Sequence, residues 1–155
     1  MPGNEPMEYK LALQRASALC SRQEQCSSQI REKLKHWEVS AEDAQKIIEL
    51  LKREKFLDDR RYATFYVRDK FRLNHWGKIK MSVMLTQKGI PQEIIEEAMK
   101  QIDPELYKQS CTRLISDKAA TIKESNPFKK KGKLFRYAAQ RGFEPDLIHQ
   151  ILSYI

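Results

Sequence analysis

The chain of 155 residues is long enough for one compact domain or a few small stacked modules, and too short for two independent domains. With 41% hydrophobic residues and only 5 Gly and 6 Pro, it should bury a core and consist mostly of regular structure. The 3 cysteines form no CxxC motif, no run approaches the roughly 18 apolar residues of a membrane span, and the first residues lack the features of a signal peptide. We therefore expect a cytoplasmic protein without disulfides or membrane segments.

Apolar residues recur every three and four positions almost throughout the chain, which predicts helices. We expect residues 1–7 to form a disordered tail. Residues 8–57 should hold three helices, whose apolar faces begin at Tyr9, Ile30 and Ala44. Ser40, which lies just ahead of the third face, has the residue type and position of an N-cap.

Residues 58–102 repeat this plan. Asp58 predicts the N-cap of the first helix of this segment. The next helix should cover about 77–88 and end before Gly89, because glycine readily takes the left-handed conformation that terminates helices. Pro91 should then open the third helix at its first turn.

Residues 103–155 repeat the plan again. Asp103 followed by proline predicts a third start, with a cap and then the first helical position. The helical pattern breaks near Asn126 and resumes as far as Gly142. Pro145 should start the last helix.

Superposing the three segments gives a weak internal repeat with a period near 51 to 53 residues. Any two amphipathic helical hairpins align to some degree, but here the caps and the core positions recur in the same order. The clearest columns are Ile30, Met81 and Leu134; Leu34, Leu85 and Ala138; and Glu38, Gly89 and Gly142. We predict an all-α fold of three tandem three-helix repeats stacked into an elongated, curved body.

The net charge of +8 favours an acidic partner, and the cations are concentrated in two segments. Residues 60–80 and 123–141 each hold seven cations and one acid, so the rest of the chain is net negative. Both segments occupy the same place in the repeat, which predicts related surfaces that bind phosphates without reading sequence, or an acidic protein surface. Trp76, beside Gly77, is a candidate exposed aromatic. The candidate contact residues are Arg60, Arg61, Arg68, Lys70, Arg72, Trp76, Lys78, Lys80, Lys129, Lys130, Lys131, Lys133 and Arg136.

An enzyme is not expected. The chain has no phosphate-binding GxxxxGK[ST] or GxGxxG motif, and its histidines and cysteines do not complete a zinc set, so we expect no cofactor and no metal. Asp58 and Asp59 could be read as the carboxylate pair of a metal-dependent nuclease. Two adjacent aspartates at a helix start are more simply explained as a cap and a charge that stabilises the helix dipole.

Residues 50–63, LLKREKFLDDRRYA, resemble the signature of the RecX family, in which an apolar helix end leads into Leu-Asp-Asp, a basic and aromatic pair, and Ala. The resemblance extends through 77–90 and, more loosely, over nearly the whole chain. Two departures are Trp76-Gly77, where the family often has Gly-Pro, and Trp37-Glu38, where it usually has glycine. The positions that match the signature are Asp58, Asp59, Arg60, Tyr62 and Ala63.

The resemblance implies a modular, non-enzymatic regulator that lies in the groove of the RecA–single-stranded DNA filament. Such a protein restrains RecA ATP hydrolysis, strand exchange and filament growth, and so regulates DNA repair, homologous recombination and the SOS response. The implied partners are the RecA filament and the backbone of single-stranded DNA, and we expect a monomer. Two alternatives stay open: a stand-alone basic helical module that binds DNA without RecA, and a small nuclease that uses the two aspartates.

Overall fold

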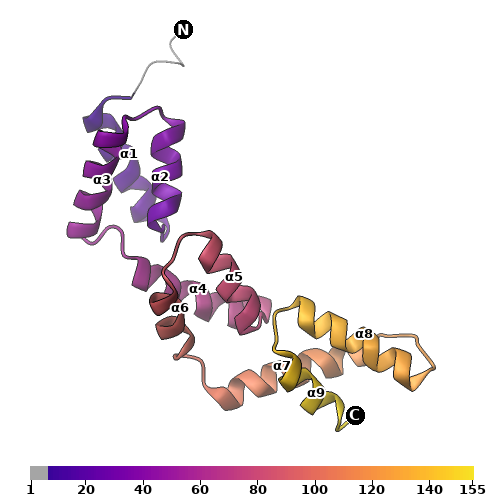
Figure 1. Ribbon diagram of the computed structural model, residues 1–155. Helices are drawn as coiled ribbons and strands as arrows, with labels where there is room; N and C mark the ends of the chain where they lie inside the picture. The colour runs from indigo at the N-terminus through magenta and orange to yellow at the C-terminus, as the bar shows by residue number, and fades with distance from the viewer. Residues whose placement is uncertain (1–6) are drawn as a thin grey trace. The chain divides into compact units, whose positions relative to one another are not determined.

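The computed structural model describes residues 7–155, and within this range it is all helical, as the sequence predicts. The helices, labelled in Figure 1, are α1 (Tyr9–Arg22), α2 (Ser27–His36), α3 (Ala41–Arg53), α4 (Asp59–Asn74), α5 (Lys78–Gln87), α6 (Gln92–Met99), α7 (Pro104–Ala119), α8 (Pro127–Gln140) and α9 (Pro145–Leu152). They form two compact units, the first comprising the chain up to Ala63 with 88–90, the second 64–87 and 91–155. The elongated, curved shape stays a prediction.

The first unit is built on helices α1, α2 and α3, which all pack against one another (Figure 1). Its core consists of Ala12, Ala16, Ile30, Leu34, Val39, Ile47, Ile48, Leu51 and Leu57. Residues 1–6 of the expected tail lie outside the described residues. Met7, also expected in the tail, packs against this core, and its backbone N–H donates to the carbonyl of Trp37 at 3.3 Å. Met7 therefore belongs with the folded unit.

The second unit buries its core between α5 and α6 and among α7, α8 and α9. Some of its fully buried side chains occupy the columns of the repeat predicted from the sequence. Met81 and Leu134 are 0% exposed, as is their counterpart Ile30 in the first unit. The burial pattern therefore supports the predicted repeat at the level of individual core positions.

The backbone at the end of the second helix of each predicted repeat supports the same alignment. Glu38, Gly89 and Gly142 have φ angles of 59°, 78° and 96°. This left-handed conformation terminates a helix, and it costs a non-glycine residue about 1–2 kcal/mol, which explains the preference for glycine in this column. Glu38 shows that the turn is kept even where glycine is absent.

Most helix starts are where the sequence placed them, because side-chain oxygens accept the first free N–H groups. Ser40 accepts from the N–H of Asp43, Asp103 from that of Glu105, and Asn126 from the first two N–H groups after Pro127. The exception is Pro91. The sequence predicts it inside the first turn of the helix, but in the structure it is the N-cap of α6 and directly precedes the first helical residue.

Candidate nucleic-acid interface

The two aspartates of the signature each accept backbone hydrogen bonds. Asp58 caps its own helix, because Oδ1 accepts from the N–H groups of Arg60 and Arg61 at 3.0 and 3.1 Å. Asp59 reaches the start of α2, where Oδ1 accepts from the N–H of Ser27 at 2.9 Å and the Ser27 hydroxyl lies 3.0 Å from Oδ2. These contacts give both carboxylates a structural role and leave the nuclease hypothesis without support from their geometry.

Arg61 is held within the first unit. Its Nε donates to both carboxylate oxygens of Glu24, at 2.8 and 2.9 Å, and its terminal nitrogens donate to the carbonyls of Lys55 and Phe56. The hydrogen bond to Glu24 is the main cause that raises the pKa of the Arg61 guanidinium. A side chain bound in this way has little freedom to reach a phosphate, so we leave Arg61 out of the proposed surface.

In the second unit, the start of α5 contacts the turn between α8 and α9. The N–H of Gly77 donates to the carbonyl of Arg141 at 2.7 Å, and the N–H of Ile79 donates to that of Gly142 at 2.9 Å. A Cβ on Gly77 would lie 2.3 Å from the carbonyl carbon of Gly142, so only glycine allows this approach. We call this contact the joint, residues 77–80 with 141–143.

Tyr107 satisfies the remaining N–H at the joint. Its hydroxyl accepts from the N–H of Lys78 at 2.8 Å and donates to Glu144, while its ring packs on Phe71 and Phe143. Burial and the bond to Glu144 raise the pKa of this phenol well above its ordinary value. Tyr107 thus does for the start of α5 what Asp59 does for the start of α2.

Beside the joint, three predicted contact residues form one cluster. The ammonium groups of Lys70 and Lys80 lie 4.9 and 4.4 Å from the ring centroid of Trp76, and Tyr66 meets the same indole edge-on at 6.4 Å. Trp76 is half-buried, so the exposed aromatic expected from the sequence is instead a support that positions two cations. We call Lys70, Trp76 and Lys80 the Trp76 cluster.

Two cations of the third repeat, one near the end of α7 and one at the end of α8, were not among the contact residues predicted from the sequence. Arg141 donates to the backbone carbonyl of Asn74 at 3.1 Å, and its guanidinium lies 5.2 Å from the ring centroid of Tyr137. The ammonium of Lys118 lies 4.8 Å from the same ring. Arg141 falls inside the basic segment 123–141, but Lys118 lies on α7, where only the fold brings it to the surface beside α8.

Two hollows border these charges. One, of about 470 Å³, lies between the end of α7 and α8, and its lining includes Lys118, Lys123, Lys133 and Arg136. Lys133 is also paired with Glu124 at 3.2 Å. The N–H of Asn126 and the ammonium of Lys133 lower the pKa of that carboxyl, so Glu124 keeps its negative charge.

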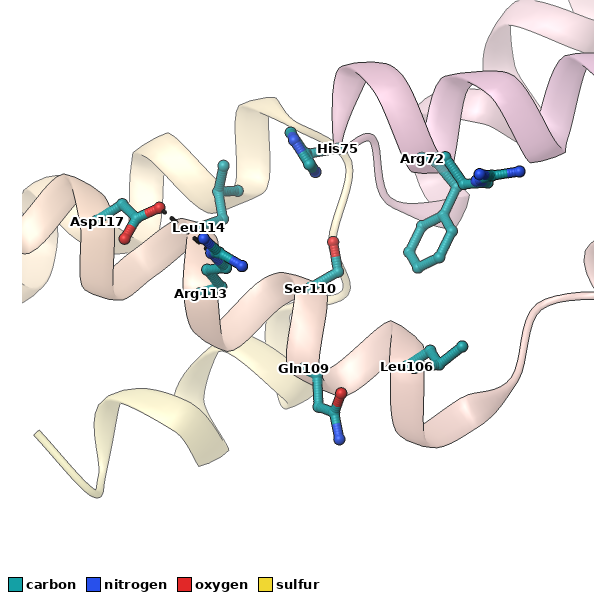
Figure 2. Close-up of a pocket in the computed structure, with 9 residues that line it drawn as sticks. Arg72, His75, Leu106, Gln109, Ser110, Arg113, Leu114 and Asp117 are labelled. Atoms are coloured by element: carbon teal, nitrogen blue, oxygen red, sulfur yellow. Dashed lines mark ion pairs between the residues drawn. The ribbon is translucent and has the colours of Figure 1, made fainter.

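The other hollow, of about 640 Å³, lies between α4 and α7 and is shown in Figure 2. Arg113 and Asp117 form a loose ion pair within it at 3.9 Å, and the guanidinium of Arg72 points away from that pair. His75 and Ser110 line the same space. The hollow therefore adds the side chains of Arg72, Arg113 and Asp117 to the surface of the second unit.

The remaining predicted cations are exposed on the surface or paired locally. Arg68 is paired with Asp69 at 3.2 Å and lies over the Phe65 ring, and Lys78 lies over Tyr107. Among residues 7–155, no group of three or more His, Cys, Asp and Glu is placed to hold a metal, and no helix is long and apolar enough to cross a membrane. The described residues thus define a tandem three-helix-repeat protein with a cationic surface on its second unit.

Comparison with known proteins identifies the family to which this chain belongs. Models of the second and third three-helix domains of RecX match residues 58–99 and 107–152. Regulatory protein RecX of Prosthecochloris aestuarii is 32% identical over 146 residues, which cover 94% of each chain. The chain therefore belongs to the RecX family of regulatory proteins.

Relatives from Clostridium and two solved structures extend the comparison. Regulatory protein RecX of Clostridium botulinum (strain Eklund 17B) is 33% identical over 127 residues, 81% of this chain, which spans only 59% of that protein. A crystal structure of RecX from Lactobacillus salivarius has a TM-score of 0.85 at 22% identity and covers 94% of this chain and 95% of that one. A crystal structure of a regulatory protein RecX also has a TM-score of 0.85, at 24% identity. At these identities the structures support the fold.

Proposed function

We propose that this protein binds the groove of the RecA–single-stranded DNA filament and modulates RecA, mostly by inhibiting its ATP hydrolysis, strand exchange and filament growth. Membership of the RecX family supports the RecA partner. In this role the protein acts in the cytoplasm, as a monomer and without catalysis or a cofactor. Blocking the groove would impede the conformational cycling that accompanies hydrolysis.

The observation that carries the proposal is the Trp76 cluster and the joint beside it. Lys70 and Lys80 are held on one indole, and the joint holds Arg141 next to them. A cation that is positioned before binding loses less side-chain entropy when it meets a phosphate. We propose that these cations, with the exposed Arg72, Lys129 and Lys131, contact DNA phosphates or acidic RecA surfaces.

The test is RecA-dependent ATP hydrolysis on single-stranded DNA, titrated with this protein. We expect suppression at amounts well below one molecule per RecA protomer. The double charge reversal Arg72→Glu with Lys129→Glu should shift the titration to higher protein concentration by tenfold or more. The double reversal Lys52→Glu with Arg53→Glu, at exposed positions on α3 in the first unit, changes the net charge by the same amount and should shift the titration little.

Two results would contradict the proposal. Hydrolysis that is unaffected by a saturating amount of protein would exclude RecA inhibition. If the protein also bound bare DNA tightly, with steep salt dependence, the function would be that of a stand-alone DNA-binding module. Equal effects of the Arg72 and Lys129 reversals and of the Lys52 and Arg53 reversals would show that the proposed surface is not the contact surface.

A further inference from the structure

Helix α8 starts one turn earlier than its counterparts. In the repeat alignment Lys131 is the counterpart of Lys78, the first residue of α5, yet α8 begins at Pro127. The N–H groups at the start of α5 bond to residues of the third repeat. The added turn of α8 begins at Pro127. Its free N–H groups are bound by the side chain of the preceding Asn126, so they need no hydrogen-bond acceptor from another repeat.

The added turn presents an aromatic ring to solvent among cations. Phe128 is 87% exposed, the largest value among the exposed large hydrophobic side chains of the described residues. Lys129, Lys130 and Lys131 follow it directly. A single exposed apolar residue is ordinary on a protein surface, so exposure alone carries no function. The surroundings of Phe128 decide the matter.

Phe128 borders a hollow of about 420 Å³ between α8 and α9. Phe135 and Leu152 contribute apolar surface to it, and the Phe135 ring is stacked on His149 at 4.7 Å between centroids. Lys131 and Arg136 line it as well, and none of the described residues that line it is acidic. The site therefore combines aromatic faces with a cationic rim.

Aromatic faces beside cations fit one class of ligand better than others. A polyanion that also carries flat apolar groups meets both the cations and the rings, and unpaired nucleobases on a phosphate backbone are such groups. Duplex DNA matches the cations but keeps its bases stacked inside. An acidic peptide matches the cations and has no general need for the rings.

We propose that Phe128 and the hollow beside it form a base-stacking subsite for single-stranded nucleic acid, in which the lysines of the added turn hold the backbone. The inference rests on the proposed function for its nucleic-acid partner and adds a preference for unpaired bases. Phosphate contacts alone give no such preference, because they are the same whether or not bases are present.

The test compares two fluorescent oligonucleotides of equal length and charge, oligo-dT and a strand of abasic sites, by fluorescence anisotropy with the full chain. Wild-type protein should bind oligo-dT more tightly. Phe128→Ala should weaken oligo-dT binding by about fivefold or more, the usual effect of losing one stacked base, and leave abasic binding unchanged. Leu73→Ala removes a side chain of comparable exposure, 75%, from α4 and should change neither.

A second variant gives a direct signal. The tryptophan of Phe128→Trp should be quenched by oligo-dT and not by the abasic strand, relative to the wild-type background from Trp37 and Trp76. Equal losses for both strands in Phe128→Ala, or no quenching in Phe128→Trp, would overturn the subsite. Weaker binding of oligo-dT than of an acidic peptide would point to a protein partner instead. The RecA hydrolysis assay reads the proposed function separately, since suppression can persist without stacking.

Discussion

The joint makes a sharp prediction, because Gly77→Ala adds only one methyl group. Its Cβ would lie 2.3 Å from both the carbonyl carbon and the carbonyl oxygen of Gly142, and 2.4 Å from the nitrogen of Phe143. These are backbone atoms, so a rotamer change cannot relieve the clash. The start of α5 and the turn at Gly142 must move apart.

The magnitude follows from what that movement breaks. Two hydrogen bonds cross the joint, from Gly77 to Arg141 at 2.7 Å and from Ile79 to Gly142 at 2.9 Å. Each contributes about 1 kcal/mol to stability, and overpacking of a buried contact costs about 1–3 kcal/mol more. We therefore expect Gly77→Ala to lower the free energy of unfolding by about 3 kcal/mol. A loss of that size is a large fraction of the stability of a small protein.

The assay is urea unfolding followed by circular dichroism, and Gly132→Ala is the matched control. Gly132 lies inside α8, where a Cβ would meet only the Nη1 of Arg136 at 3.8 Å. Alanine there should raise stability by about 0.5–1 kcal/mol, since glycine weakens a helix interior. If Gly77→Ala leaves the unfolding midpoint unchanged, or shifts it as Gly132→Ala does, the close approach at the joint is refuted.

Three further predictions test separate contacts. Asp59→Ala removes the acceptor at the start of α2 and should lower the unfolding free energy by about 1–2 kcal/mol in urea; no loss would mean that water replaces the carboxylate. A double-mutant cycle of Arg61→Ala and Glu24→Ala should give a coupling of about 1 kcal/mol, because the pair is partly exposed and screened. Folding raises the pKa of Tyr107 above 10.0 and that of Cys111 from 9.0 to about 12, so both hold protons more tightly when folded. Stability should therefore fall as pH rises above about 9, and Tyr107→Phe should weaken that fall; a flat midpoint from pH 8 to 11 would contradict it.

Most helix boundaries could be predicted from residues that are close together in the sequence. Helix starts depend on a side chain reaching an N–H two or three residues away, so Ser40 and Asp103 could be assigned from their neighbours alone. The left-handed turn that ends the second helix of each repeat also depends on the conformation of a single residue. The glycines at 89 and 142 indicated its position in the sequence. Both features are written within a few residues of sequence.

Contacts over long sequence separations could not be predicted in this way. Asp59 bonds a residue 32 positions away and Arg61 one 37 positions away, so their charges suggested chemistry or binding where the structure shows internal hydrogen bonds. The need for glycine at position 77 could not be predicted from the sequence either. Its reason is the turn at Gly142, which leaves no room for a side chain at Gly77.

Two helix starts that could bind a phosphate are already occupied by groups of the protein itself. A helix start with free N–H groups is a ready anion site, yet the start of α2 is occupied by Asp59 and that of α5 by Tyr107 and the carbonyls of 141 and 142. Backbone groups at these two starts are therefore not available to a phosphate, and the proposed function assigns the phosphate contacts to side-chain cations. Affinity carried by lysine and arginine depends on counterion release, so log K should fall linearly with log salt concentration. Removing one contact cation, such as Lys129 by Lys129→Ala, should reduce that slope by about one, whereas Phe128→Ala should leave it unchanged while still weakening binding to unpaired bases.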